Sequence, residues 1–198
     1  MPVLYYVRHG ETDWNVEHRL QGHRDTLLNA KGRRQAEHCG NLLRELLVRD
    51  GFVPQDCNYV ASPLLRARET MELVREALDL DPDAYEVDPR LTEISFGEWE
   101  GLTFPEIASR DPRLLDERER DKWDFKPPGG ESYRDVTVRV GEWYATVDRD
   151  MVVAAHGGVA RALIAYLGIM QPEAATHADI RHGVVYMFSG GNKMARYA

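Results

Sequence analysis

The feature that most constrains this chain is a pair of short apolar runs, each ending abruptly in a histidine. The run 3–7 is followed by Arg8-His9-Gly10, and the run 151–155 is followed by His156-Gly157-Gly158. Short continuous apolar runs with β-branched and aromatic residues are typical of strands buried on both faces of a parallel sheet. Because the carboxyl ends of parallel strands share one edge of the sheet, the two histidines are expected to face one another across a ligand.

Helical and strand patterns alternate along much of the chain, which predicts an α/β fold with a mainly parallel sheet and right-handed crossovers. Helices are expected from an N-cap at Asn29 to near 51, from about 63 to 78, after the Pro-Pro-Gly-Gly run at 127–130, and from near 159 to 167. Further strands are expected at 56–61 and 85–87. A closing hairpin is expected from 184–188 and 194–197 around Gly190-Gly191-Asn192.

The pair Ser62-Pro63 opens the second of these helices in the sequence. Serine is a favoured N-cap and proline fits the first helical position, where no amide donor is needed. Arg66 then lies in the first turn, where its guanidinium and the helix dipole together favour an anion. The alternative is that Arg66, Arg68 and Glu69 form a solvated face with local ion pairs.

The segment from about 91 to 130 interrupts the alternation of strands and helices. Thr103 and Glu106 have the spacing of a capping box that opens a short helix ending near Asp111. Charges of both signs then alternate densely to Asp124, which favours a solvated helix, although a mobile cover over a site is the alternative. We therefore expect residues 1–198 to form a single domain with a lid-like insertion at about 91–130.

The triplet Arg181-His182-Gly183 repeats the sequence of residues 8–10. It precedes an apolar run instead of following one, so it is expected at the opposite edge of the sheet. The repetition is interpreted as a coincidence without a catalytic role.

Composition excludes several classes of protein. The chain has 198 residues, 43% of them hydrophobic, and a formal net charge of −8. An acidic chain without a Lys/Arg cluster is not expected to bind nucleic acid. No apolar run reaches the roughly 20 residues that span a bilayer, so no membrane association is expected. No signal peptide is expected before the first strand, because charged residues follow it almost at once.

The two cysteines, Cys39 and Cys57, have neither a disulfide framework nor a metal-binding spacing. Both are expected to be reduced thiols of a cytoplasmic protein, with Cys39 on an apolar helical face. The oligomeric state stays open between a monomer and a homodimer.

Several further short motifs accompany the two histidines. In chain order they are residues 8–15, 19–22, 62–67 with Thr70, 91–93, 96–101, 128–132 and 156–158. Together, over nearly the whole chain, they resemble the histidine phosphatases, the family that also includes the cofactor-dependent phosphoglycerate mutases. This resemblance implies a three-layer α/β/α sandwich of the phosphoglycerate mutase type.

The resemblance also implies roles for individual residues. His9 matches the nucleophile that becomes phosphorylated, and Glu93 matches the general acid. The family's phosphate pocket is matched by Arg8, Arg66 and His156, assisted by Asn15 and Gly157. Gln21 and Gly22 match substrate-binding positions of the family.

The chemistry of these side chains fits such roles. A neutral imidazole, with an ordinary pKa of ~6.5, can attack phosphorus if its other nitrogen donates to a fixed acceptor. Two guanidinium groups and a second histidine can surround the equatorial oxygens of the transferring phosphoryl group. One carboxyl group can protonate the leaving oxygen and later accept a proton from water. No metal ion and no cofactor are therefore expected.

Four other carboxylates compete with Glu93 for the role of general acid, and their alternative roles are ion pairs or turn hydrogen bonds. They are Glu11, Glu98, Glu100 and Glu131. Glu93 is expected where a strand exits into the loop before Phe96, and only the resemblance selects it.

The segment after Glu93 bears on the reaction. Mutases of the family carry a Tyr-Gly pair and basic residues here, whereas this chain has Phe96-Gly97-Glu98-Trp99-Glu100. That departure is similar to the phosphatase branch that includes α-ribazole phosphatase and fructose-2,6-bisphosphatase-like members. It predicts hydrolysis of a small phosphorylated metabolite. A cofactor-dependent phosphoglycerate mutase and a non-catalytic phospholigand-binding module are the alternatives.

Overall fold

A six-stranded mixed sheet forms the centre of the molecule, in a computed structural model that describes residues 2–190 and 192–198. The strands are β1 (Leu4–Arg8), β2 (Asn58–Ala61), β3 (Glu86–Val87), β4 (Met151–Ala155), β5 (Val185–Ser189) and β6 (Lys193–Tyr197). Their order is β3-β2-β4-β1-β5-β6. The first four are parallel, whereas β5 and β6 run antiparallel to β1 and to each other. The expected α/β fold and mainly parallel sheet are confirmed.

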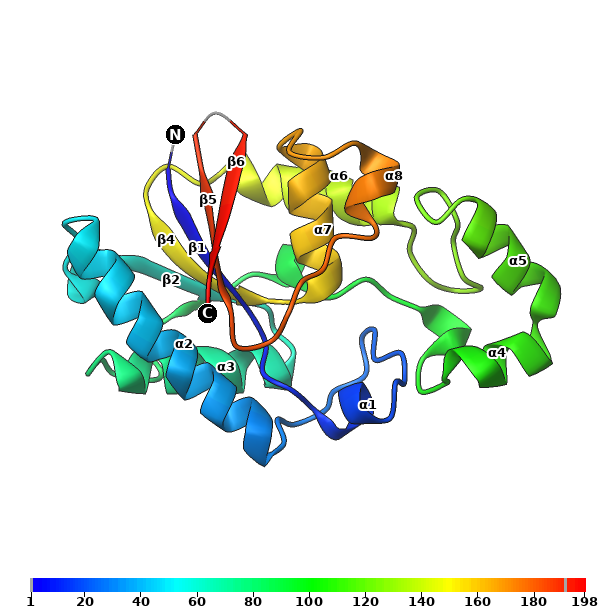
Figure 1. Ribbon diagram of the computed structural model, residues 1–198, viewed down its shortest axis with the longest axis horizontal. Coiled ribbons are helices and arrows are strands. Elements are labelled where there is room, and N and C mark those ends of the chain that lie inside the picture. Colours follow the sequence, from blue (N-terminus) through cyan, green and yellow to red (C-terminus); the bar gives the residue numbers. More distant parts are fainter. Residues whose placement is uncertain (1, 191) are drawn as a thin grey trace.

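Helices cover both faces of the sheet (Figure 1). The α-helices are α1 (Asp13–Val16), α2 (Ala30–Arg49), α3 (Leu65–Ala77), α4 (Phe104–Arg110), α5 (Pro112–Arg120), α6 (Tyr133–Tyr144), α7 (Gly157–Tyr166) and α8 (Pro172–Ala175). Short 3₁₀ helices are η1 (Pro54–Asp56), η2 (Pro89–Leu91) and η3 (Gly97–Trp99). No helix among the described residues is long and apolar enough to cross a membrane.

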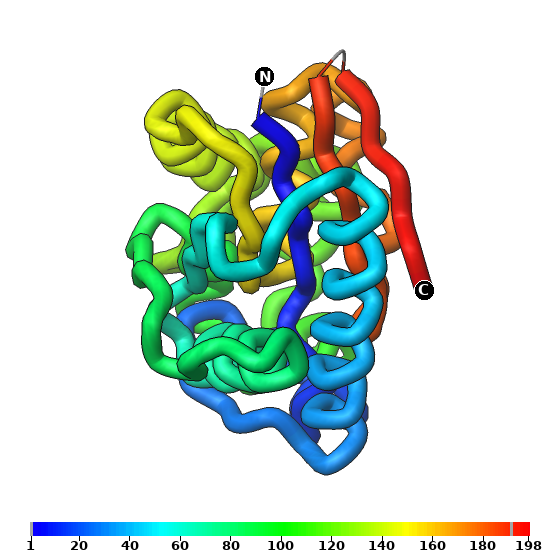
Figure 2. Tube along the Cα trace, turned by 90° about the vertical axis from the view of Figure 1, so that its left-hand side faces the viewer, coloured from blue at the N-terminus to red at the C-terminus, as the bar shows by residue number. Residues whose placement is uncertain are grey.

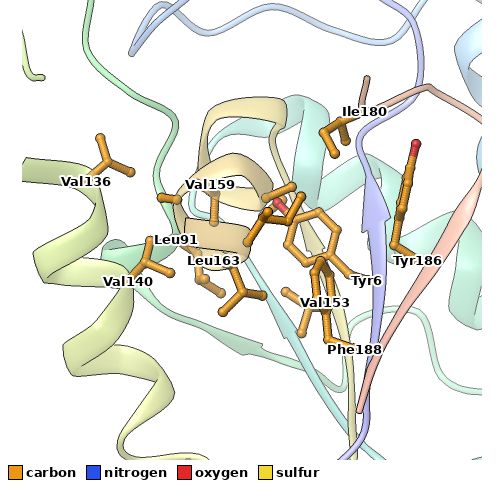
Figure 3. Close-up of a cluster of buried hydrophobic side chains, with 14 of the residues drawn as sticks. Tyr6, Leu91, Val136, Val140, Val153, Val159, Leu163, Ile180, Tyr186 and Phe188 are labelled. Carbon is orange, nitrogen blue, oxygen red and sulfur yellow. The ribbon is translucent and has the colours of Figure 1, made fainter. Parts of the chain in front are cut away.

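Successive side chains of β1 point alternately to the two faces of the sheet and pack with different helices on each face. Tyr5 and Val7 pack with residues of α2 and α3, which lie on the side that faces the viewer in Figure 2. Leu4 and Tyr6 belong to the hydrophobic cluster on the opposite face, together with residues of α6 and α7. Figure 3 shows Tyr6 in this cluster. All four side chains are at most 1% exposed. A strand buried on both faces explains why its sequence is continuously apolar.

Local sequence rules account for most helix starts. Asn29 caps α2 by accepting from the Gly32 amide at 2.8 Å, as expected. Thr103 and Glu106 form the expected capping box of α4. The segment 91–130 carries α4 and α5, which project away from the sheet in Figure 1. Its lid-like role stays a prediction.

The expected helix start at Ser62 is wrong. Helix α3 begins at Leu65 with Leu64 as N-cap and without a side-chain cap, because the backbone remains extended through Leu64 (φ −70°, ψ 138°). The Ser62 hydroxyl instead lies 2.7 Å from Nε2 of His156. Arg66 still falls in the first turn of α3, as expected.

The turn of the closing hairpin involves Gly191, which lies outside the described residues. Its flanking strands, β5 and β6, pair antiparallel as expected.

Candidate active site

The strand ends of β1, β2 and β4 meet at one edge of the sheet. The His9 amide donates to the Ala155 carbonyl at 2.9 Å, and the Ser62 amide donates to the Ala154 carbonyl at 3.0 Å. The rings of His9 and His156 consequently lie 5.2 Å apart, centroid to centroid. The expectation that two histidines distant in sequence would meet here is confirmed.

A pocket opens at this edge and gathers most of the residues singled out in the sequence. Its lining includes Arg8, His9, Asn15, Gln21, Gly22, Arg66, Glu93 and Gly157. His156 lies behind them and is fully buried. The structure therefore brings all nine predicted site residues into one place, whereas their individual roles stay predictions.

His9 is held in a form that suits a nucleophile. Its Nδ1 lies 2.8 Å from the Gly10 carbonyl, and a carbonyl can only accept, so Nδ1 carries the proton and Nε2 keeps its lone pair. Burial, reinforced by the nearby guanidinium groups of Arg66 and Arg8, holds the pKa of His9 well below its usual value. The ring is therefore neutral and nucleophilic at neutral pH.

His156 is oriented by two neighbours. The Tyr6 hydroxyl receives the His156 amide at 2.9 Å and donates to the His156 carbonyl at 2.5 Å. The Ser62 hydroxyl accepts weakly from the Leu64 amide at 3.4 Å, which leaves its proton to donate to Nε2 of His156. In the tautomer in which the Ser62 hydroxyl donates to Nε2, the ring proton of His156 is on Nδ1. Burial, followed by the charges of Arg66 and other neighbours, holds the pKa of His156 well below its usual value.

Two guanidinium groups, the buried one of Arg66 and the partly buried one of Arg8, lie at this edge and are held there by hydrogen bonds to backbone carbonyls. Arg66 donates to the carbonyls of Gly22 and Arg24, both at 2.8 Å, and Arg8 donates to the Ile180 carbonyl at 2.6 Å. Burial lowers the pKa of Arg66 to about 10 and also lowers that of Arg8. Arg66 therefore remains charged at neutral pH, although no carboxylate forms an ion pair with either group among the described residues.

Three buried nitrogens of this cluster have no hydrogen-bond partner among the described residues. They are Nε of Arg8, Nε of Arg66 and Nδ1 of His156. A buried donor without a partner costs about 1–3 kcal/mol. An anion with several acceptor oxygens, such as a phosphoryl group, would offer partners to donors of this kind.

Glu93 is the only one of the five competing carboxylates that lines the pocket, as far as the described residues show. Its carboxylate accepts from the Gly158 amide at the start of α7, at 3.0 and 3.2 Å, and from the Ile94 amide at 2.9 Å. Glu93 follows the 3₁₀ helix η2 and not a strand, because β3 already ends at Val87. Its expected place at a strand exit is therefore wrong.

The four rival carboxylates have structural partners or lie in solvent. Glu11 pairs with Lys31 at 2.9 Å, and Glu131 receives two bonds from Arg139 at 3.0 Å. Glu100 accepts from backbone amides of the neighbouring loops, and Glu98 is exposed.

The predicted substrate-binding residues Gln21 and Gly22 form part of the pocket wall. The Gln21 side chain accepts from the Thr26 hydroxyl at 2.6 Å. Gly22 adopts a positive φ of 52°, and a Cβ atom there would lie 2.1 Å from a carboxylate oxygen of Glu100. The Asn15 side-chain oxygen accepts from the Thr12 amide and hydroxyl, both at 3.1 Å, and thereby helps to cap α1.

Arg161 and Arg19 line the same pocket, although neither was predicted as a site residue. A Cβ atom on Gly157 would lie 3.3 Å from Nη1 of Arg161 and 3.6 Å from Nε of Arg8, so the two guanidinium groups flank this glycine. Arg161 is the only charged residue in the largely apolar helix α7 and follows Gly157 by one helical turn. This four-residue spacing from Gly157 is the sequence pattern from which Arg161 could have been predicted as a pocket residue.

His182 was also missed, and its expected location is wrong. The His182 ring lies 5.5 Å from the His9 ring, centroid to centroid. Strand β5 is antiparallel to β1, with Val185 opposite Val7, so the start of β5 lies at the edge where β1 ends. The histidine of the second Arg-His-Gly triplet therefore lies beside the histidine of the first.

The chain is similar to known proteins over almost its whole length. The model of the histidine phosphatase superfamily (branch 1) matches residues 4–196. The 2,3-bisphosphoglycerate-dependent phosphoglycerate mutase 2 of Gloeobacter violaceus is 32% identical over 195 residues, which cover 95% of this chain and 85% of that protein.

Solved structures show the same likeness. The mycobacterial glucosyl-3-phosphoglycerate phosphatase Rv2419c superposes with a TM-score of 0.79 at 30% identity, covering 94% of this chain and 89% of that one. The protein TTHB049 from Thermus thermophilus superposes with a TM-score of 0.73 at 32% identity, covering 99% of both chains.

Proposed function

Because the chain belongs to the histidine phosphatase superfamily, we propose that it hydrolyses a small phosphomonoester through a phosphohistidine on His9. One observation carries this proposal. A neutral His9, with Nδ1 bonded to the Gly10 carbonyl, shares its site with three buried nitrogens that have no hydrogen-bond partner among the described residues, Nε of Arg8, Nε of Arg66 and Nδ1 of His156. Such a site combines a nucleophile with charge stabilisation for a phosphoryl group.

In the first step, Nε2 of His9 attacks phosphorus and the ester P–O bond breaks. The Glu93 carboxyl group gives its proton to the leaving alkoxide. In the second step, water attacks the phosphorus of phosphohistidine, Glu93 accepts a proton from that water, and the P–N bond breaks. Arg8, Arg66 and Nδ1 of His156 bind the equatorial oxygens in both steps, so the proposed reaction proceeds without a metal ion.

A labelling experiment tests this proposal. Brief exposure of the protein to a ³²P-labelled phosphomonoester should give an acid-labile label on His9. The variant His9→Ala should show neither label nor turnover, and His177→Ala, which removes an exposed histidine, should behave as the wild type. Unchanged turnover of His9→Ala would overturn the proposal. Tight phosphate binding by a wild-type protein that forms no label would instead indicate a non-catalytic binding module.

Hydrolysis is favoured over mutase chemistry by the acidic segment that follows Glu93. Glu98 is exposed and Glu100 lies beside the Gly22 turn at the pocket wall. Their negative charge disfavours the second phosphate group of a bisphosphate cofactor.

Phosphoglycerate mutase is the second candidate, and a cluster of cations beyond Phe96 favours it. Burial, followed by repulsion from Arg118 and Arg161, lowers the pKa of Lys122 to about 8. Arg118 and Lys122 line a hollow that shares Phe96 with the catalytic pocket. Such a cluster suits a substrate with a second anionic group, and the Gloeobacter relative is named for mutase activity.

The two reactions are separated by incubation with 3-phosphoglycerate, with and without 2,3-bisphosphoglycerate. Hydrolysis predicts that phosphate release exceeds formation of 2-phosphoglycerate in both cases. Isomerisation faster than phosphate release would replace the proposal with the mutase. The variant Lys122→Met tests the role of the cation cluster, and Arg113→Met, with a side chain 87% exposed, is its matched control.

A further inference from the structure

The segment that leads into β5 contacts both members of the catalytic pair Arg8-His9. The Ile180 carbonyl accepts from Nη1 of Arg8 at 2.6 Å. Two residues later, the His182 ring lies 5.5 Å from the His9 ring, at an interplanar angle of 52°. The phosphoryl transfer described above uses neither Ile180 nor His182.

His182 is a mostly buried imidazole in a charged neighbourhood. Its Nε2 is buried and has no hydrogen-bond partner among the described residues. Burial, together with the Arg8 and Lys31 cations and against the opposing effect of Glu11, lowers the pKa of His182 to about 3. The ring is therefore neutral across the physiological range, and His182 is not among the described residues that line the pocket.

The single hydrogen bond of the His9 ring does not by itself fix the orientation of that ring. That bond reaches only the carbonyl of the next residue, Gly10, and the χ2 torsion of histidine has two broad minima. A half-turn of the ring would take Nδ1 away from that carbonyl and change which atom faces the phosphorus. Neighbouring side chains that fill the space around the ring prevent such a turn.

The neutral state of His182 also matters for the reaction. The His9 ring becomes positively charged when it accepts the phosphoryl group, and Arg8 and Arg66 already lower its pKa. A cationic neighbour would oppose that charge further, whereas a neutral aromatic ring fills the space without adding repulsion.

We propose that His182 is a positioning residue for the His9 nucleophile. This inference rests on the proposed function. The His182 ring packs beside His9 and keeps its Nδ1 on the Gly10 carbonyl and its Nε2 available to phosphorus. His182 acts through His9 and makes no contact with the substrate.

Kinetics of two variants test this role. His182→Ala should lower kcat about tenfold, because small misplacements of a nucleophile cost one to two orders of magnitude in rate, while KM changes less than twofold. His182→Phe keeps a neutral ring of similar shape and should recover most of the lost kcat. His177→Ala, an exposed histidine of the same segment, is the matched control. Thermal unfolding of each variant checks that it is folded.

Nitrogen-15 NMR of histidine-labelled protein provides a second measurement that does not depend on turnover. The wild type and His182→Phe should show one His9 tautomer, with the proton on Nδ1. His182→Ala should show mixed or exchanging His9 signals.

Three results would overturn the inference. The first is a His182→Ala variant with wild-type kcat and a single His9 tautomer. The second is a rise in KM of His182→Ala at unchanged kcat. The third is a kcat of His182→Phe as low as that of His182→Ala. A wild-type protein that forms no phosphohistidine would overturn the proposed function, whereas the tautomer measurement would still decide whether His182 positions His9.

Discussion

The triplet Arg-His-Gly occurs twice, at residues 8–10 and 181–183, and its two copies have different surroundings. In the first copy His9 is 2% exposed and the Arg8 guanidinium is inside the site. In the second copy Arg181 points outward, with a side chain 63% exposed that pairs with Asp179 at 2.5 Å. His182 nevertheless lies beside His9. The difference teaches that the same three residues take different roles according to the direction of the adjoining strand and the burial of each side chain.

The largest expected difference between the copies is catalytic. His9→Ala removes the nucleophile and should lower kcat by about 10⁴-fold or more, since no other side chain replaces the phosphohistidine. His182→Ala should retain about a tenth of the wild-type kcat. Steady-state phosphate release measures both. Equal losses in the two variants would mean that the copies share the chemistry.

The two glycines should differ in their effect on stability. A Cβ atom on Gly10 would lie 2.2 Å from the backbone oxygen of Gly32, which cannot move aside freely. Gly10→Ala should therefore destabilise the fold by about 3 kcal/mol or more.

Gly183 is the matched comparison for Gly10. It has a φ of 68°, and the nearest atom to its Cβ would be a flexible Gln35 carbon at 3.3 Å. Gly183→Ala should cost about 1–2 kcal/mol, from the strained backbone. Urea denaturation measures both values, and a Gly183→Ala cost that matched Gly10→Ala would contradict this reading of the contacts.

The two arginines should differ in phosphate binding. Arg8→Met removes a buried donor and should lower kcat/KM about 10²- to 10³-fold. Arg181→Met removes an exposed ion pair worth less than about 1 kcal/mol and should leave kcat/KM within twofold of the wild type. Inhibition by inorganic phosphate should weaken only in Arg8→Met. Weaker inhibition of Arg181→Met would place the second copy in the pocket.

A further expected difference is in the pH dependence of stability. The pKa values of His9, His156 and His182 are all lowered by folding, so at low pH the unfolded state binds more protons than the folded state. Their contribution to stability is fully present above the ordinary histidine pKa of ~6.5 and is lost as the pH falls below it, by up to about 1.4 kcal/mol per pH unit for each histidine.

The variant His182→Phe isolates one of these contributions. For His182 the loss continues down to a pH of about 3. Between pH 6 and pH 4, His182→Phe should therefore lose stability less steeply than the wild type. Chemical denaturation at a series of pH values measures both slopes. Identical slopes would show that His182 is already protonated in the folded protein.

Much of this protein could be predicted from the sequence because the relevant rules are local. Apolar runs locate β1 and β4, and the polar residue that follows each run locates His9 and His156. The capping residues Asn29 and Thr103 fix the starts of α2 and α4. Such patterns depend on neighbours within a few residues, so the chain itself contains them.

Other features required the tertiary structure because they depend on residues far apart in the chain. Residue type alone offered five carboxylates as a general acid, and the family resemblance selected Glu93. The folding of Glu93 against the start of α7 then separates it in space from Glu11, Glu98, Glu100 and Glu131. Ser62 reads as a helix cap, yet the proximity of β2 and β4 gives it His156 as a partner. The antiparallel direction of β5 brings His182 to His9. The sequence by itself thus determined that His9 and His156 follow apolar strands, whereas the pairing and direction of the strands decided which strand ends meet.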